Sequence, residues 1–317
     1  MQYLNDLGVK DLLYDEWPKI IESIEEAFVD SSSEIVPKIY LNSHTKGDFR
    51  AMPVALGDYA CVKWIGVYPY NHLISEVLPT TLGTLILNNR ETGKPLMAMD
   101  CTTLTAYRTA ATSAIAAKYC APDAEEFAFI GCGLQAKYHI EAYESIFGHM
   151  KMSVELYDAC KSPMYQMFNW LGRENLCHAW GRNESVKQAV QHADVVTTLT
   201  PSKKAYLDIF DLKSNCHINA VGADAVGKRE LMPNVIDGAS LIVCDDEEQA
   251  QHSGELQYNT WPNLQPQSLK SIIKNKKVPN KGGISVFDST GVAIEDVAIA
   301  ILIYNLWKKH YNKKIKK

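Results

Sequence analysis

A glycine turn between two apolar runs carries the most specific chemistry in this sequence. Gly131, Gly133 and Ala136 have the spacing G-x-G-x-x-A and follow the apolar run 127–130. In this pattern the first glycine permits a tight turn and the second lets the backbone approach a pyrophosphate, while the small third residue lets the next helix pack closely. The amino end of that helix would face the phosphate charge. The turn therefore indicates a dinucleotide-binding loop, with an ordinary glycine turn as the alternative.

An acidic residue after the next β-rich run, 154–157, indicates which dinucleotide this loop would bind. Asp158 lies 22 residues after Ala136. A carboxylate at that distance can accept hydrogen bonds from both ribose hydroxyls, and it would repel the 2′-phosphate of NADP. Lys161 is the one nearby residue that would favour such a phosphate. We therefore predict NAD as the cofactor.

Lys63 occurs in a β-like run, 59–67, at a position where an apolar residue would be expected. The alternation of the run places Lys63 on the same face as Cys61 and Ile65. A lysine there either lies at a sheet edge with its ammonium in water or enters a cavity that holds an anion. The further cations Arg50 and Arg108 favour the cavity.

Arg108 lies in an alanine-rich stretch, 103–119, which is expected to form a helix closed by Pro122. Its neighbours one helical turn away are all small or apolar, so the arginine should lie close to another backbone or to a ligand. The planar guanidinium suits a carboxylate or a phosphate. The alternative is an ion pair with an acidic side chain of the protein.

The second half of the sequence predicts an α/β fold. Short apolar runs alternate with helical stretches, which is typical of a Rossmann-type doubly wound parallel sheet. The expected strands are 127–130, 154–157, 194–199, 217–221, 241–244 and 284–287, and the expected helices include 164–171 and 185–192. Ligands bind beyond the carboxyl ends of such strands. Asp224 follows one of these ends and is the acid best placed for chemistry, unless it caps a following helix.

The two ends of the chain predict a separate α+β domain. We expect a helix over 11–30, β-like runs at 35–41, 49–56 and 59–67, a hairpin of 82–86 with 96–99, and an apolar helix reaching residue 307. That last helix is too apolar to stand alone, so it should pack against the N-terminal region. The domains would then be 1–120 with 292–317, built from both chain ends, and 121–291, which contains the predicted NAD-binding loop.

Composition excludes several classes of protein. The chain has 317 residues and a formal net charge of -5, which argues against a nucleic-acid surface. Its eight cysteines have neither C-x-x-C nor zinc-type spacing, so we expect no disulfide framework and no metal site. We predict neither a secretory signal nor a membrane span, and therefore a cytoplasmic protein with no membrane partner.

Motifs along the whole chain resemble the ornithine cyclodeaminase/μ-crystallin family. They are FRAMP (49–53), VKW (62–64), LPTT (78–81), ETGKPLMAMD (91–100), LTAYRTAATSAIAAKY (104–119), FIGCGLQA (129–136), HINAVGADAVGKREL (217–231) and VFDSTGVAIEDVA (286–298). The resemblance implies a two-domain, homodimeric, NAD(P)-dependent enzyme that acts on amino or imino acids. Its N-terminal domain would bind substrate and form the dimer contact, completed by the C-terminal helix.

The resemblance also implies roles for individual residues. Lys63 and Arg108 would bind the substrate carboxylate, and Asp224 matches the catalytic aspartate of the family. The residues implied to line the cofactor are Thr80, Arg108, Thr109, Gly131, Gly133, Leu134, Gln135, Asp158, Thr198, Ala220, Val221, Gly222, Lys228 and Ser289.

One position separates the activities within this family. Cyclodeaminases carry a glutamate two residues before Met-Pro, suited to a second ammonium group, whereas this sequence has Arg50 there. Arginine would repel a second amine and bind a carboxylate. FRAMP, IGCGLQA and VGADAVGK are also more similar to the archaeal-type alanine dehydrogenase branch.

We therefore predict an NAD-dependent dehydrogenase of a small L-amino acid. Arg50 and Arg108, with Lys38 as a possible helper, would bind the carboxylate, and Lys63 or Asp224 would act as the acid/base. Burial among cations should lower the pKa of Lys63. The alternatives are an ornithine cyclodeaminase, which makes proline and ammonia, a ketimine reductase or μ-crystallin-like NAD(P)H-binding protein, and an enzyme that joins an amine to a 2-oxo acid.

Overall fold

The chain divides into two compact units. The computed structural model describes residues 1–43, 47–75, 78–149, 151–258, 264–276, 278 and 282–315. Unit 1 consists of Met1–Thr109 with Val292–Lys317, and unit 2 consists of Ala110–Gly291. The first boundary falls within helix α4 (Thr102–Cys120), whereas the sequence suggested a boundary after it. Along α4, Thr103 N donates to Asp6 in unit 1, whereas Ser113 bonds His139 in unit 2, so one helix contributes to both cores.

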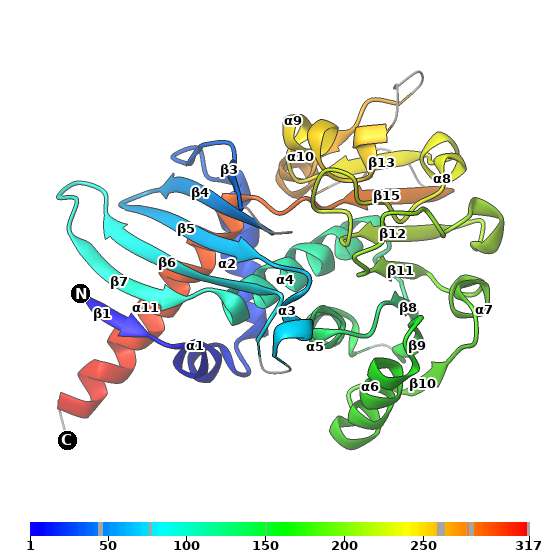
Figure 1. Ribbon diagram of the computed structural model, residues 1–317, viewed down its shortest axis with the longest axis horizontal. Coiled ribbons are helices and arrows are strands. Elements are labelled where there is room, and N and C mark those ends of the chain that lie inside the picture. Colours follow the sequence, from blue (N-terminus) through cyan, green and yellow to red (C-terminus); the bar gives the residue numbers. More distant parts are fainter. Residues whose placement is uncertain are drawn as a thin grey trace. The chain divides into compact units, whose positions relative to one another are not determined.

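Unit 1 is built on a seven-stranded sheet (Figure 1). Its strands lie in the order β1-β7-β6-β5-β4-β2, with β3 also paired to β4. Among these described strands β1 and β7 run parallel, and the other pairs are antiparallel. The strands are β1 (Gln2–Leu4), β2 (Glu34–Ile35), β3 (Ile39–Asn42), β4 (Asp48–Leu56), β5 (Tyr59–Val67), β6 (Thr81–Asn89) and β7 (Pro95–Asp100). The predicted hairpin is confirmed as β6–β7. The predicted run 35–41 is instead two short strands, which pair with β4 in registers that differ by one residue, so the ladder is interrupted between them.

Helices cover one face of this sheet. Helix α11 (Ala293–Ile315) packs against β4, β5 and β6 and also against α2 (Trp17–Val29), and Figure 1 shows it crossing behind the strands. The apolar C-terminal helix therefore packs against the N-terminal region, as its composition predicted. The predicted helix 11–30 was wrong in extent, because two helices, α1 (Asp6–Leu13) and α2, occupy this region. The helical backbone is interrupted at Asp15, which has a positive φ of 58°. Pro18 lies in the first turn of α2, where proline is tolerated, whereas a proline inside a continuous helix would disrupt it. A single-turn helix, α3 (Asn71–Ile74), precedes β6.

Unit 2 confirms the predicted doubly wound sheet. All of its strand pairs are parallel, in the order β10-β9-β8-β11-β12-β15-β13-β14. The strands are β8 (Glu126–Ile130), β9 (Ser153–Tyr157), β10 (Ala179–Arg182), β11 (Val195–Thr198), β12 (Cys216–Ala220), β13 (Leu241–Cys244), β14 (Gln267–Ser268) and β15 (Ile284–Asp288). The chain leaves β8 toward β9 and β10, and then returns to place β11 on the other side of β8. The direction of winding therefore reverses between β8 and β11, which is where such folds bind ligands.

Helices connect the strands of unit 2. They are α5 (Leu134–Phe147), α6 (Lys161–Glu174), α7 (Val186–Val190), α8 (Pro233–Asp237), α9 (Glu247–His252) and α10 (Leu269–Asn275), with the short 3₁₀ turns η1 (Ile209–Asp211) and η2 (Glu255–Tyr258). Strands β11, β12 and β15 are buried along their whole length, as expected for a parallel sheet. Within the described ranges, none of the helices is long and apolar enough to cross a membrane.

Candidate functional site

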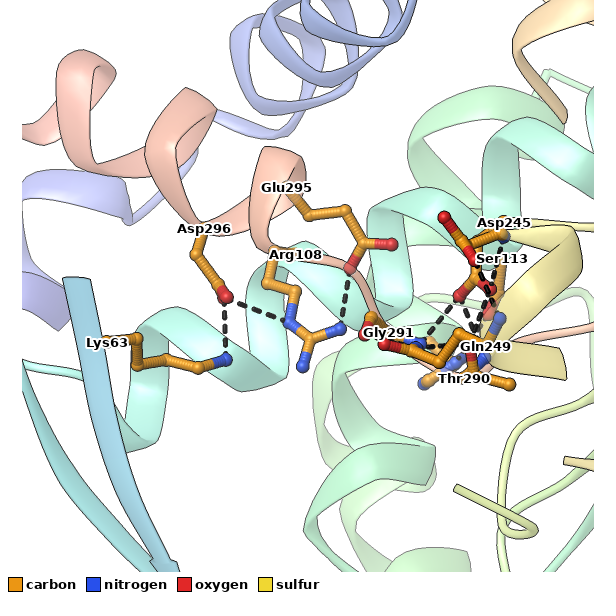
Figure 2. A network of polar contacts seen from close by, with 11 residues as sticks. Lys63, Arg108, Ser113, Asp245, Gln249, Thr290, Gly291, Glu295 and Asp296 are labelled. Carbon is orange, nitrogen blue, oxygen red and sulfur yellow. Dashed lines mark hydrogen bonds and ion pairs between the residues drawn. The ribbon is translucent and has the colours of Figure 1, made fainter. Parts of the chain in front are cut away.

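Four charged side chains form a buried cluster in unit 1 (Figure 2). Lys63 Nζ lies 2.7 Å from Asp296 Oδ1, and Arg108 Nη1 lies 2.6 Å from Glu295 Oε2. Arg108 Nε lies 3.3 Å from the same Asp296 oxygen, so Asp296 joins the two cations. The Lys63 side chain is only 1% exposed and both acidic side chains are 0% exposed. Two cations and two anions are thus held out of water in mutual contact.

Three secondary-structure elements bring this cluster together. Lys63 points to the helix-covered face of β5, Arg108 lies on α4, and both acids lie in the first turn of α11. The amino end of a helix favours negative side chains, and buried charges need partners. A water-exposed position for Lys63 was therefore the wrong alternative. For Arg108 the alternative of an internal ion pair is the one the structure shows.

Glu295 and Asp296 were not identified from the sequence. The signal was available, because two consecutive acids open a helix whose next residues, 297–300, are all apolar. Charges on the buried part of such a helix require opposite charges nearby. Pairing them with Lys63 and Arg108 required the tertiary fold.

The cluster alters the ionisation of Lys63. Burial lowers the pKa of the Lys63 ammonium below its usual range, Asp296 opposes this by raising that pKa, and Arg108 lowers it further. The direction agrees with the prediction from the sequence, and burial is the largest cause. Burial likewise raises the pKa of the nearby Cys61 and Cys101 thiols, so both remain protonated and neutral.

Arg50 lies on the same inner face as Lys63. In the register of β4 and β5, Arg50 is opposite Ile65 and Met52 is opposite Lys63. Arg50 and Lys63 are therefore diagonal neighbours, whose Cα atoms are typically about 7–8 Å apart. Arg50 is 5% exposed, its Nε donates to Asp48 Oδ1 at 2.7 Å, and its guanidinium lies over the Tyr40 ring. The inner face of the sheet therefore carries two neighbouring positive side chains, Arg50 and Lys63.

Three further residues of unit 1 that were predicted for the site are not members of this cluster. Lys38 is half-buried between β2 and β3, and Thr80 is exposed just before β6, where its carbonyl accepts from Tyr68 N at 2.7 Å. Thr109 is buried beside Arg108 on α4. Their contacts with substrate or cofactor stay predictions.

The glycine turn of unit 2 has the geometry of a dinucleotide loop. Gly131 has a φ of +99°, and a Cβ there would lie 3.0 Å from the Leu199 carbonyl oxygen. A Cβ on Gly133 would meet nothing within 4 Å, so this glycine faces open space. Ala136 is 0% exposed, as expected where α5 packs against the sheet.

The start of α5 offers polar groups to a ligand. In the part of the chain that the structure describes, no side chain caps this helix at Gly133, and Leu134, its first residue, is 56% exposed. Gln135 Oε1 is buried and has no hydrogen-bond partner among the described residues. Amide groups at an uncapped helix start and an open glycine are the features that fit a pyrophosphate.

The Asp158 side chain links the glycine turn to the loop that follows β9. Its Oδ2 accepts from Cys132 N at 2.8 Å, and its Oδ1 accepts from Cys160 N at 2.7 Å. The carboxylate is half-buried at the end of β9, next to the glycine turn. The position agrees with that expected of a ribose-binding acid, and the residues of this region fit a bound NAD.

Further predicted residues gather at the carboxyl ends of β11, β12 and β15. Thr198 is 0% exposed, and its hydroxyl donates to Glu230 Oε2 at 2.7 Å. Ala220, Val221 and Ser289 are buried, and the Ser289 amide donates to the Ala220 carbonyl. These contacts place the residues together at one edge of the sheet, and their contact with a cofactor stays a prediction.

Asp224 lies in the loop after β12, where its carboxylate accepts from the ammonium of Lys228. The alternative that it caps a following helix was wrong, because the described chain turns at Gly227 and the next helix begins at Pro233. Lys228 and Asp224, both predicted site residues, are thus direct partners in unit 2.

A buried acid also holds the loop after β15 (Figure 2). Asp245 accepts from the backbone amides of Thr290 at 2.8 Å and Gly291 at 2.6 Å. Gln249 donates to the Gly291 carbonyl at 3.0 Å. These hydrogen bonds fix the backbone of the loop at the end of unit 2.

Comparison with known proteins identifies the family. The profile of the Ornithine cyclodeaminase/mu-crystallin family matches residues 9–311. The chain belongs to this family. The resemblance suggested by the sequence motifs is thereby confirmed.

Members of the ornithine cyclodeaminase/mu-crystallin family with different activities are similar to this chain. An alanine dehydrogenase of Archaeoglobus fulgidus is 37% identical over 310 residues, covering 93% of this chain and 92% of that protein. An ornithine cyclodeaminase of Agrobacterium fabrum is 31% identical over 308 residues, covering 93% and 83%. A solved archaeal alanine dehydrogenase dimer with bound NAD has a TM-score of 0.89 and 34% identity, covering 98% of this chain and 97% of that one. The fold and the family are therefore shared with both dehydrogenases and cyclodeaminases.

Proposed function

We propose that this protein is an NAD-dependent oxidoreductase that acts on the CH–NH2 group of a small L-amino acid and releases a 2-oxo acid and ammonia. The observation that carries the proposal is the buried Arg50, one diagonal step from Lys63 on the inner face of unit 1. A guanidinium at this position favours a substrate carboxylate and disfavours a second ammonium group. The identity of 37% to an alanine dehydrogenase supports alanine as the first substrate to test.

NAD would be held by unit 2. Gly131 and Gly133 leave room for the pyrophosphate, the first turn of α5 offers amide groups, and Asp158 offers carboxylate oxygens to a ribose. When bound, NAD supplies the acceptor for the hydride that leaves the amino acid.

Arg50 and Arg108 would bind the substrate carboxylate, with Lys38 as a helper. Asp48 holds the Arg50 guanidinium, and Glu295 and Asp296 hold that of Arg108. Fixed cations orient the substrate, and orientation is the main requirement that hydride transfer places on a protein. The acids thus serve to keep the arginines in position.

Lys63 is our candidate for the base. Burial lowers the pKa of its ammonium, which increases the share of the neutral amine that can accept a proton from the substrate ammonium, while Asp296 orients the Nζ group. The Cα–H bond then breaks as hydride leaves, and the nitrogen lone pair forms the C=N bond of an imine. Water adds to that carbon, a proton is returned to nitrogen, and ammonia leaves as the C=O bond of the 2-oxo acid forms. Asp224 is the second candidate for these proton transfers.

A homodimer would form through the uncovered face of the unit 1 sheet. Trp64, Leu82 and Ile86 are 42%, 36% and 37% exposed on this face. Exposed apolar groups of this kind mark interaction surfaces, and the similar archaeal alanine dehydrogenase is a dimer. Light scattering should give twice the mass of the chain, and the Trp64→Arg variant should give the mass of a single chain.

We further infer a cytoplasmic location, because all eight cysteines are free thiols.

Ornithine cyclodeaminase is the rival activity. The Asp48 side chain is 26% exposed beside Arg50 and could accept a hydrogen bond from a side-chain ammonium. The deciding experiment incubates the protein and NAD with L-alanine or L-ornithine, and measures NADH absorbance and ammonia. NADH and ammonia with alanine would support the dehydrogenase. Ammonia from ornithine without NADH would replace it with the cyclodeaminase.

A further inference from the structure

Glu230 is a buried carboxylate that the proposed chemistry does not use. It is 0% exposed in unit 2, in the segment between β12 and α8. Every described group within hydrogen-bond distance of its two oxygens carries an N–H or O–H that can donate, which fits an ionised carboxylate. The donors are Thr198 Oγ1 at 2.7 Å, Thr200 N at 2.7 Å, Thr200 Oγ1 at 2.6 Å, Tyr206 Oη at 2.8 Å and Gly222 N at 2.9 Å. Burial raises the pKa of the Glu230 carboxyl, and the hydrogen bonds from Thr200 and Thr198 oppose this.

Apart from Thr198, the last residue of β11, these donors lie in the loops that follow two neighbouring strands. Thr200 follows β11 and Gly222 follows β12. A Cβ on Gly222 would lie 2.2 Å from the Thr200 carbonyl oxygen and 2.6 Å from Glu230 Cδ. Residue 222 must therefore be glycine, because the carboxylate and the neighbouring loop fill the space of a side chain. Glu230 holds the two backbones in contact.

The order of the sheet indicates which part of a dinucleotide these loops would serve. The winding reverses between β8 and β11. In such folds each half of the sheet binds one mononucleotide. The half containing β8, β9 and β10 carries the glycine turn and Asp158, which suit the adenosine ribose and the pyrophosphate. The half containing β11 and β12 is left for the nicotinamide mononucleotide.

We propose that Glu230 is a positioning residue for the nicotinamide half of the cofactor site. It fixes the backbones at Thr200 and Gly222 through hydrogen bonds and makes no contact with the cofactor itself, because it is 0% exposed. This role rests on the NAD binding of the proposed function.

The test compares the affinities of two ligands, NAD and AMP, in calorimetric titrations of the whole chain. Each Glu230 oxygen accepts from one backbone N–H, that of Thr200 or that of Gly222, and an N–H cannot accept. In Glu230→Gln the NH2 group therefore faces one of these two N–H groups, and at least that loop contact must break. We expect the affinity for NAD to fall about tenfold or more, while AMP, which lacks the nicotinamide half, binds as before. Amide hydrogen exchange should accelerate at Thr200 and Gly222. Glu230→Asp, which keeps the charge on a shorter side chain, should recover part of the NAD affinity.

Asp194 provides a matched control at the amino end of β11, whereas Glu230 lies at the carboxyl ends of the strands. Its carboxylate accepts from the backbone amides of Glu125 at 3.0 Å and Glu126 at 3.1 Å. Asp194→Asn should therefore lower the thermal stability and leave the ratio of NAD to AMP affinity unchanged. If Glu230→Gln proves too unstable, Tyr206→Phe removes a single donor and should give a smaller loss of the same kind.

The outcomes are distinguishable. A folded Glu230→Gln variant that binds NAD as tightly as the unsubstituted protein would overturn the role of Glu230 alone. An equal loss of AMP and NAD affinity would show that Glu230 merely supports the unit, and would also overturn it. Failure of the unsubstituted protein to bind NAD would overturn the proposed function and the positioning role together. NAD binding without turnover of any amino acid would overturn only the proposed activity.

Discussion

The two units use buried acids in different ways. In unit 1, Glu295 and Asp296 pair with the side chains of Lys63 and Arg108, so acids hold cations. In unit 2, Asp158, Glu230 and Asp245 accept from backbone amides, so acids hold loops. A side chain held by another side chain can itself meet a charged substrate, whereas a loop held by an acid presents its remaining backbone groups. The difference suggests charge recognition in unit 1 and shape recognition in unit 2.

Removing the Lys63 side chain from the charged cluster of unit 1 should have the largest effect on turnover and stability. Lys63→Ala should lower kcat for alanine about 10²–10⁴-fold, because the base is lost. It also leaves Asp296 without its closest cation, which should cost about 3–5 kcal/mol of unfolding free energy. Stopped-flow NADH absorbance and thermal denaturation measure the two effects. The control is Lys187→Ala, which breaks an ion pair of two partly exposed side chains and should change neither. Unchanged turnover in Lys63→Ala would refute the assignment of the base.

Arg50 tests whether unit 1 recognises charge. Arg50→Ala should raise KM for alanine about 10- to 100-fold, because a charged hydrogen bond to the carboxylate is lost. The Kd for NAD should stay constant, since Arg50 is not among the residues predicted to line the cofactor. Arg90→Ala, which breaks an exposed pair with Glu34, is the matched control. A parallel loss of NAD affinity would contradict the separation of roles between the units.

The two glycines of unit 2 test whether its recognition depends on shape. Gly133→Ala adds a methyl group to open space at a φ of −81°, so stability should hold while the Kd for NAD rises about tenfold. Gly131→Ala forces a side chain into a φ of +99°, which should cost about 1–3 kcal/mol of stability. Titration calorimetry and denaturant unfolding on both variants separate these effects. Equal stability losses in the two variants would argue against the open cradle at Gly133.

The smallest expected effect concerns Glu255, whose Oε1 accepts from Glu230 N at 2.6 Å. Burial raises the pKa of Glu255 to about 8, the Glu230 carboxylate adds to this, and Arg229 opposes it. The folded state therefore binds the proton more tightly than the unfolded chain does, and stability from this group is lost as pH rises from about 4.5 to about 8. Denaturation midpoints of Glu255→Gln should depend less on pH in this window. A parallel pH dependence in both proteins would show that Glu255 ionises normally.

Local pattern was enough to predict much of the fold and part of the candidate site. Hydrophobic alternation placed Lys63 on the buried face of β5, because the side-chain period of a strand is two wherever the strand lies. The glycine spacing predicted the turn between β8 and α5, because backbone conformation and close packing depend on these few residues. The break between α1 and α2 was missed, since helical periodicity continues across it.

The identity of the charged partners required the tertiary structure. Lys63 pairs with Asp296 across 233 residues of sequence, and Arg108 with Glu295 across 187. The sequence alone could not choose between a ligand and an internal acid for Arg108, because both satisfy the same guanidinium. Glu230 likewise gave no local signal, since its donors come from loops that meet only when β11 and β12 pair. Periodicity is a property of neighbouring residues, whereas the pairing of a buried charge depends on which elements fold against it.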